Sequence, residues 1–135
     1  MVRDETAVEY RPEVIVDFGV EDGLLSVHLK NVGRRSAYRV ATKFDKAFYG
    51  LNGHKCISDM RLFRKLDFMA PEKQFSQFVD TLANYARRKQ PLRLKATVSY
   101  RDREGNRFED TIVHDLRIYL ELGQAKLIKA NKGDF

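Results

Sequence analysis

The sequence predicts an all-β fold, an immunoglobulin-like antiparallel β-sandwich of about seven strands with a short helical turn before the penultimate strand. Several segments alternate apolar and polar residues with the period of two that a strand with one buried face requires. Clusters of Gly, Asn and Asp separate these segments and are typical of tight turns. Because a lone sheet would leave its apolar face in water, two packed sheets are expected.

The N-terminal part begins with a predicted hairpin. Residues 13–20 and 25–30 each alternate clearly, and a turn signal at residues 21–23 lies between them. The pattern breaks at the next turn, where we expect Gly33 to supply a positive φ.

A third strand and a long connection follow. Alternation resumes through Tyr38, Val40, Thr42 and Phe44, which predicts a strand. Residues 45–59 hold glycines and scattered aromatic residues without a period, and they predict an irregular connection.

The next elements are less clearly patterned. Residues 60–68 alternate and predict a strand that ends ahead of a proline. Residues 74–86 fit both a strand and a helix. We therefore expect a short strand to Val79, followed by one or two helical turns with Asp80 as the N-cap.

The last two strands form a second predicted hairpin. Residues 92–100 alternate regularly, residues 102–106 contain a Gly turn, and residues 107–119 are expected to form the final strand. The predicted organisation is an N-terminal extension at 1–11, the sandwich at 12–120 and a C-terminal tail at 121–135 that could add a short helix at 124–131.

The composition bounds the class of protein. Hydrophobic residues at 43% and charged residues at 33% are typical of a folded domain rather than a disordered chain. The apolar runs are far shorter than the roughly 20 residues of a membrane-spanning helix. Residues 1–13 are charged where a signal peptide would be apolar. Cys56 is the only cysteine, so an internal disulfide is excluded. We expect a cytoplasmic protein, or a soluble fragment of a membrane-associated one.

Basic residues concentrate in one segment. The chain has a net charge of +6, and residues 34–65 contain nine Lys or Arg against two Asp, so this segment carries +7 and the remainder −1. Such side chains could contact phosphate groups from one face of a sheet, with Tyr38 and Phe48 as stacking surfaces. The candidate polyanion-binding residues are Arg34, Arg35, Arg39, Lys43, Arg61, Arg64 and Lys65.

Several short motifs recur along the strands and turns of the predicted sandwich. They are Leu29-Lys30-Asn31-Val32-Gly33 with Ala37 and Val40, Leu66-Asp67-Phe68 before Pro71, Val98-Ser99-Tyr100-Arg101-Asp102 with Gly105, and Asp115-Leu116. Together they resemble bacterial immunoglobulin-like modules of the CARDB (adhesion-related) type. The resemblance covers roughly residues 12–120 and implies structural roles for these motifs in turns and core strands. It also implies an accessory domain of a larger envelope or membrane-anchored protein, and no particular activity.

The histidines and the cysteine match no catalytic or metal-binding motif. His28 is expected on the solvent face of its strand, and His114 points away from its neighbour Asp115. His54 and Cys56 lie close in sequence but offer too few ligands for a structural zinc site. No catalytic residue, metal or cofactor is therefore predicted.

The functional prediction is a non-enzymatic protein–protein interaction or accessory module. Binding residues concentrate on connections that a rigid scaffold holds, so the candidate surfaces are the turns at 33–36 and 101–107 and the connection at 45–59. The partner would be another protein or a second copy of the chain, bound by these loops or by an exposed strand edge. The alternative is nucleic-acid or other polyanion binding through residues 34–65.

Overall fold

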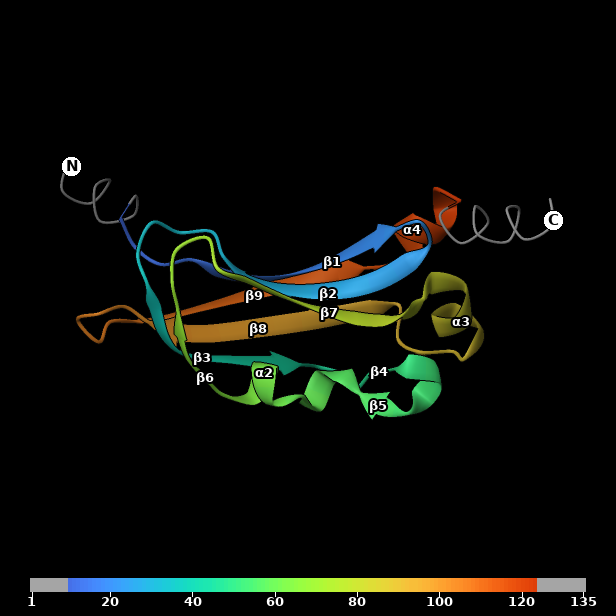
Figure 1. The fold of residues 1–135 in the computed structure, drawn as a ribbon, viewed down its shortest axis with the longest axis horizontal. Coiled ribbons are helices and arrows are strands. Elements are labelled where there is room, and N and C mark those ends of the chain that lie inside the picture. Colours follow the sequence, from blue (N-terminus) through green and yellow to red (C-terminus); the bar gives the residue numbers. More distant parts are fainter. Residues whose placement is uncertain (1–9, 124–135) are drawn as a thin grey trace.

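The computed structural model describes residues 10–123, which form two antiparallel sheets packed face to face (Figure 1). The three-stranded sheet has the order β1-β2-β7, and its strands are β1 (Val14–Glu21), β2 (Leu24–Asn31) and β7 (Gln74–Thr81). The four-stranded sheet has the order β6-β3-β8-β9, and its strands are β6 (Leu66–Met69), β3 (Ala37–Phe44), β8 (Arg93–Arg101) and β9 (Arg107–Asp115). The predicted all-β sandwich is confirmed.

The core lies between the two sheets and is built from the inward residues of each strand. On β2, Leu25, Val27 and Leu29 are fully buried, and on β8 every second residue from Leu94 to Tyr100 is at most 2% exposed. The alternation in the sequence therefore reports burial against the opposite sheet.

Both predicted hairpins are present. Asp22 and Gly23 join β1 to β2 with φ values of 52° and 75°, as a two-residue type I′ turn requires. In the β8–β9 turn the carboxylate of Asp102 accepts hydrogen bonds from the backbone N–H and the side-chain amide of Asn106. Gly105 has a φ of 88° in the same turn.

The connection between β3 and β6 contains only short elements. They are β4 (Tyr49–Gly50), a 3₁₀ turn η1 (Leu51–Gly53), β5 (Lys55–Cys56), a second 3₁₀ turn η2 (Ile57–Asp59) and α2 (Arg61–Arg64). The predicted strand over residues 60–68 is therefore wrong in its first half. The Phe63 N–H donates to the Met60 carbonyl at 2.9 Å, and this turn places the Phe63 ring in the core against Phe44.

The prediction for residues 74–86 is correct in outline and wrong in its cap. Strand β7 runs two residues past Val79, and α3 (Leu82–Arg87) supplies the short helical turn before β8. The N-cap is Thr81, whose hydroxyl accepts from the Asn84 N–H at 3.1 Å, because the Asp80 carboxylate has other partners.

The final strand is shorter than predicted. It ends at Asp115, and α4 (Arg117–Glu121) follows. The Leu116 N–H donates to the Leu92 carbonyl at 2.7 Å, so the chain turns inward and Leu116 is buried. The expected helix at 124–131 lies outside the described residues, and the domain boundaries stay a prediction.

His114 lies on the inner side of β9, between the sheets. Its ring packs edge-to-face on Phe18 at 5.1 Å, and its Nε2 atom is buried without a hydrogen-bond partner among the described residues. Burial lowers the pKa of His114 below its usual value of 6.5, although Asp17 and the Val16 backbone act in the opposite direction.

We expect protonation of His114 to weaken the fold. Its pKa is lower in the folded state, so the unfolded state takes up the proton first as the pH falls, and the free energy of unfolding should drop below about pH 6.5. Urea titrations of wild type and His114→Gln between about pH 7 and about pH 5 test this. The wild type should lose stability relative to the variant, and a difference independent of pH would contradict the prediction.

Candidate anion-binding site

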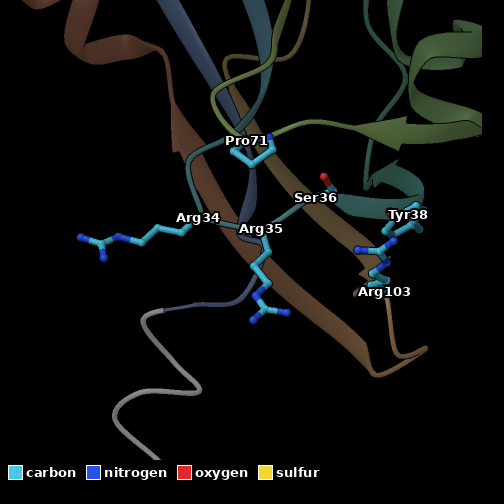
Figure 2. A pocket seen from close by; sticks show the side chains of 6 residues that line it. All are labelled: Arg34, Arg35, Ser36, Tyr38, Pro71 and Arg103. Atoms are coloured by element: carbon cyan, nitrogen blue, oxygen red, sulfur yellow. The ribbon is translucent and has the colours of Figure 1, made fainter.

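Two of the predicted loop surfaces meet at one end of the sandwich. Loop 33–36 and the β8–β9 turn line a surface hollow of about 380 Å³, named here the turn hollow, whose residues are Arg34, Arg35, Ser36, Tyr38, Pro71 and Arg103 (Figure 2). Figure 2 shows Arg34 and Arg35 leaving the loop in different directions, with Arg103 and Tyr38 on the other side. Among these lining residues are three arginines and no carboxylate. The connection at 45–59 lies at the other end of the sandwich (Figure 1).

Asn31, which is fully buried, fixes this loop to its neighbours. Its side-chain amide donates to the carbonyls of Arg35 at 2.8 Å and Met69 at 3.1 Å. Its side-chain oxygen accepts from the backbone N–H groups of Glu13 at 3.2 Å and Gly33 at 3.0 Å. One side chain therefore ties together three segments, and it holds the backbone that carries the arginines of the turn hollow.

Gly33 is required for a different reason from the predicted one, because its φ is not positive. A Cβ atom at this position would lie 2.4 Å from both the Arg11 carbonyl oxygen and the Glu13 nitrogen, which are backbone atoms. The glycine allows two backbone segments to approach closely.

A β-bulge in β3 forms a second basic hollow next to the first. Arg39 has a φ of 52°, which is strained for a residue with a side chain, and the register with β8 shifts between Tyr38 and Ala41. This hollow of about 470 Å³ is named here the bulge hollow, and its lining residues are Arg39, Val40, Ala41, Arg64, Lys65 and Asp67.

Four side chains, among them Tyr38 of the turn hollow, form one row across the outer face of the four-stranded sheet. The backbone register pairs Phe68 with Tyr38, Tyr38 with Arg101, and Arg101 with Arg107. The Phe68 and Tyr38 rings are 5.4 Å apart, and Phe68 is 49% exposed. Like charges at facing positions destabilise a sheet, so the pairing of Arg101 with Arg107 is unfavourable for folding. Of these two arginines, only Arg107 has an ion-pair partner among the described residues, Glu109 at 3.3 Å.

The structure separates the seven residues predicted from sequence. Arg34 and Arg35 lie at the turn hollow, and Arg39, Arg64 and Lys65 lie at the bulge hollow. Lys43 and Arg61 are exposed, on β3 and α2 respectively, and neither lines a hollow described here.

The seven residues predicted from sequence omit four members of the surface. They are Phe68, Arg101, Arg103 and Arg107. All four lie outside the basic segment 34–65, although the last three fall within the turn at 101–107 that the sequence predicted as a binding surface. Only the pairing register places Phe68, Arg101 and Arg107 in one row with Tyr38. The predicted stacking residue Phe48 is fully buried, so it is not available to a ligand.

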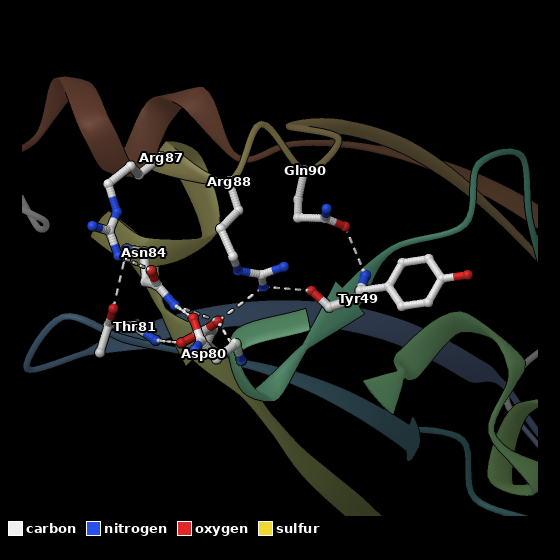
Figure 3. A network of polar contacts seen from close by, with 8 residues as sticks. Tyr49, Asp80, Thr81, Asn84, Arg87, Arg88 and Gln90 are labelled. Atoms are coloured by element: carbon white, nitrogen blue, oxygen red, sulfur yellow. Dashed lines mark hydrogen bonds and ion pairs between the residues drawn. The ribbon is translucent and has the colours of Figure 1, made fainter. Parts of the chain in front are cut away.

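The opposite end of the sandwich holds a polar network with a structural role (Figure 3). The Asp80 carboxylate accepts from Arg88 at 2.9 Å, from the Asn84 amide at 3.0 Å and from the Asn52 backbone N–H at 3.1 Å. Arg88 also donates to the Tyr49 carbonyl at 3.0 Å. Burial raises the pKa of Asp80, but these hydrogen bonds outweigh it and the pKa lies below its usual value. The network fastens β4, η1 and α3 to β7.

One histidine contacts a hydroxyl group. On the outer face of the three-stranded sheet, His28 Nδ1 lies 2.8 Å from Ser76 Oγ, and Asp17 pairs with His28 in the register. A catalytic triad needs the carboxylate to orient the imidazole. Asp17 instead accepts from the Phe18 backbone N–H at 3.0 Å.

Within residues 10–123, no three His, Cys, Asp or Glu side chains are grouped to hold a metal ion.

No helix among the described residues has the length and apolar character needed to cross a membrane.

Fold and surface together define an antiparallel β-sandwich domain with a basic, partly aromatic face on its four-stranded sheet. The chain belongs to a family described as a domain of unknown function, DUF8453, whose model matches residues 2–120. Comparison with curated proteins and with solved structures gives no match.

Proposed function

We propose that the domain is a non-catalytic binding module and that its partner is a phosphate-bearing polyanion. The observation that carries the proposal is the turn hollow, whose lining includes Arg34, Arg35 and Arg103 and no carboxylate. On most protein surfaces, acidic residues are interspersed among the basic ones.

The surrounding charges support the same partner. Within residues 10–123, neither Arg101 nor Arg39 forms an ion pair, and both are exposed. Arginine presents a planar array of donors that suits two phosphate oxygens at once. Repulsion between the like charges on this face makes folding less favourable, and binding of an anion would reduce that repulsion.

We also propose that the domain is related to CARDB-type modules and serves as an accessory domain. The all-β sandwich supports this relationship. An acidic protein is the competing partner, because arginine also binds carboxylates.

Charge reversal tests the proposal. Arg35→Glu with Arg103→Glu should weaken binding of fluorescent inorganic polyphosphate by about tenfold or more at low salt and reduce the salt dependence of binding. Fluorescence anisotropy at low and at physiological salt measures both effects.

The matched control is Lys55→Glu with Lys89→Glu, which changes the net charge equally at the other end of the sandwich. This control should retain most of the binding. Equal losses in the two variants, or tighter binding of polyglutamate than of polyphosphate, would refute a phosphate-binding face.

A further inference from the structure

We infer that the polyanion is single-stranded nucleic acid, with bases stacked on Phe68 and Tyr38 and phosphates bound by the arginines beside them. The inference rests on the proposed function, because it names the partner of the same surface. It adds an aromatic contribution that a simple polyanion site would lack.

The first observation is an aromatic pair of which Phe68 is exposed and Tyr38 is half-buried. Phe68 and Tyr38 are neighbours across β6 and β3, tilted by 59° with ring centroids 5.4 Å apart. They point outward, because the adjacent pair Ala37 and Met69 is fully buried and successive residues of a strand face opposite sides. A phenylalanine that is 49% exposed on an open sheet gains little from the core and offers a flat apolar surface.

The second observation is the placement of positive charge on both sides of this pair. Towards β9 the same row continues into Arg101 and Arg107. The turn hollow contains Tyr38 itself, and the bulge hollow contains Arg39, the next residue in sequence, with two further cations against the single carboxylate of Asp67. A ligand that contacts all three features must therefore alternate planar apolar groups with anionic groups.

A single nucleic-acid strand has this alternation, and a duplex does not present it. In a duplex the bases are stacked inside the helix, and a side chain on an open sheet face cannot stack on them. Proteins that bind single strands combine an aromatic stacking surface with a basic track for the backbone. The pair and the two hollows supply both parts.

The test separates stacking from charge. Anisotropy titrations would compare a labelled oligothymidylate, an abasic strand of the same length, a duplex and inorganic polyphosphate, using wild type, Phe68→Ala and Phe68→Trp. We expect the oligothymidylate to bind more tightly than the abasic strand or the duplex. Phe68→Ala should weaken oligothymidylate binding by about 5- to 100-fold and leave polyphosphate binding unchanged, and Phe68→Trp should restore it.

Phe78→Ala is the matched control, because Phe78 is 39% exposed on β7 of the other sheet, and it should bind as wild type does. Thermal melts confirm that each variant is folded. Equal affinity for the oligothymidylate and the abasic strand, tighter duplex binding, or no effect of Phe68→Ala would overturn the inference while polyphosphate binding upholds the proposed function. If polyphosphate does not bind at low salt, the proposed function itself fails.

Discussion

Replacing Arg88 by methionine should lower the free energy of unfolding by about 3–5 kcal/mol, because it leaves the buried Asp80 carboxylate without its charged partner. The two side chains meet at 2.9 Å, and they are 19% and 9% exposed respectively. Methionine keeps most of the apolar stem of arginine, so the cost reports the lost charge and hydrogen bonds rather than lost packing. Urea denaturation of the purified domain measures it.

Three further variants isolate the cause. Arg87→Met removes the neighbouring, exposed guanidinium and should change stability by less than about 0.5 kcal/mol. Asp80→Asn combined with Arg88→Met removes the unpaired charge and should recover part of the loss. Together with Asp80→Asn alone, it gives the coupling energy of the pair. A loss below about 1 kcal/mol for Arg88→Met would show that Asp80 is protonated or solvated in the folded state.

The strands were predictable where burial alone decides the pattern. Residues of β1, β2 and β8 alternate because one face of each strand packs on the opposite sheet, and the turn at Asp22-Gly23 needs backbone angles that these residue types favour. Residues 60–64 alternated as well, but local hydrogen bonds wind them into a helical turn. A period of two over so few positions does not distinguish these cases.

The candidate site could be predicted only in part, because it depends on pairing between distant segments. The sequence alternation through Tyr38 and Val40 implies that both share one face of β3. The bulge at Arg39 instead places Val40 in the core and Tyr38 outside. That one-residue shift places Tyr38 in one row with Phe68 and Arg101. No local sequence pattern predicts the shift. The excess of basic residues was visible in the sequence, whereas its division between two hollows was not.

Replacing Asn31 by alanine should destabilise the domain by more than about 3 kcal/mol, because it leaves four buried or partly buried backbone groups without their partners. Three segments lose their common attachment at once, and a cavity replaces the amide. Asn106→Ala is the control, because the Asn106 side-chain amide donates one hydrogen bond, to the Asp102 carboxylate, at an exposed turn. It should cost about 1 kcal/mol or less, again measured by urea denaturation.

Asn31→Asp then distinguishes the hydrogen bonds that the Asn31 side chain accepts from those that it donates. An aspartate can still accept from Glu13 and Gly33, but it cannot donate to the carbonyls of Arg35 and Met69, and it buries a charge. We expect it to be as destabilising as alanine at neutral pH and to recover stability as the pH falls and the carboxyl is protonated. The folded fraction of this variant should also bind polyphosphate less tightly than wild type does, because the Arg35 backbone is no longer held in place. Wild-type affinity in a variant of reduced stability would show that the arginines reach their ligand without a fixed loop, which would separate the fold of this end of the sandwich from its binding.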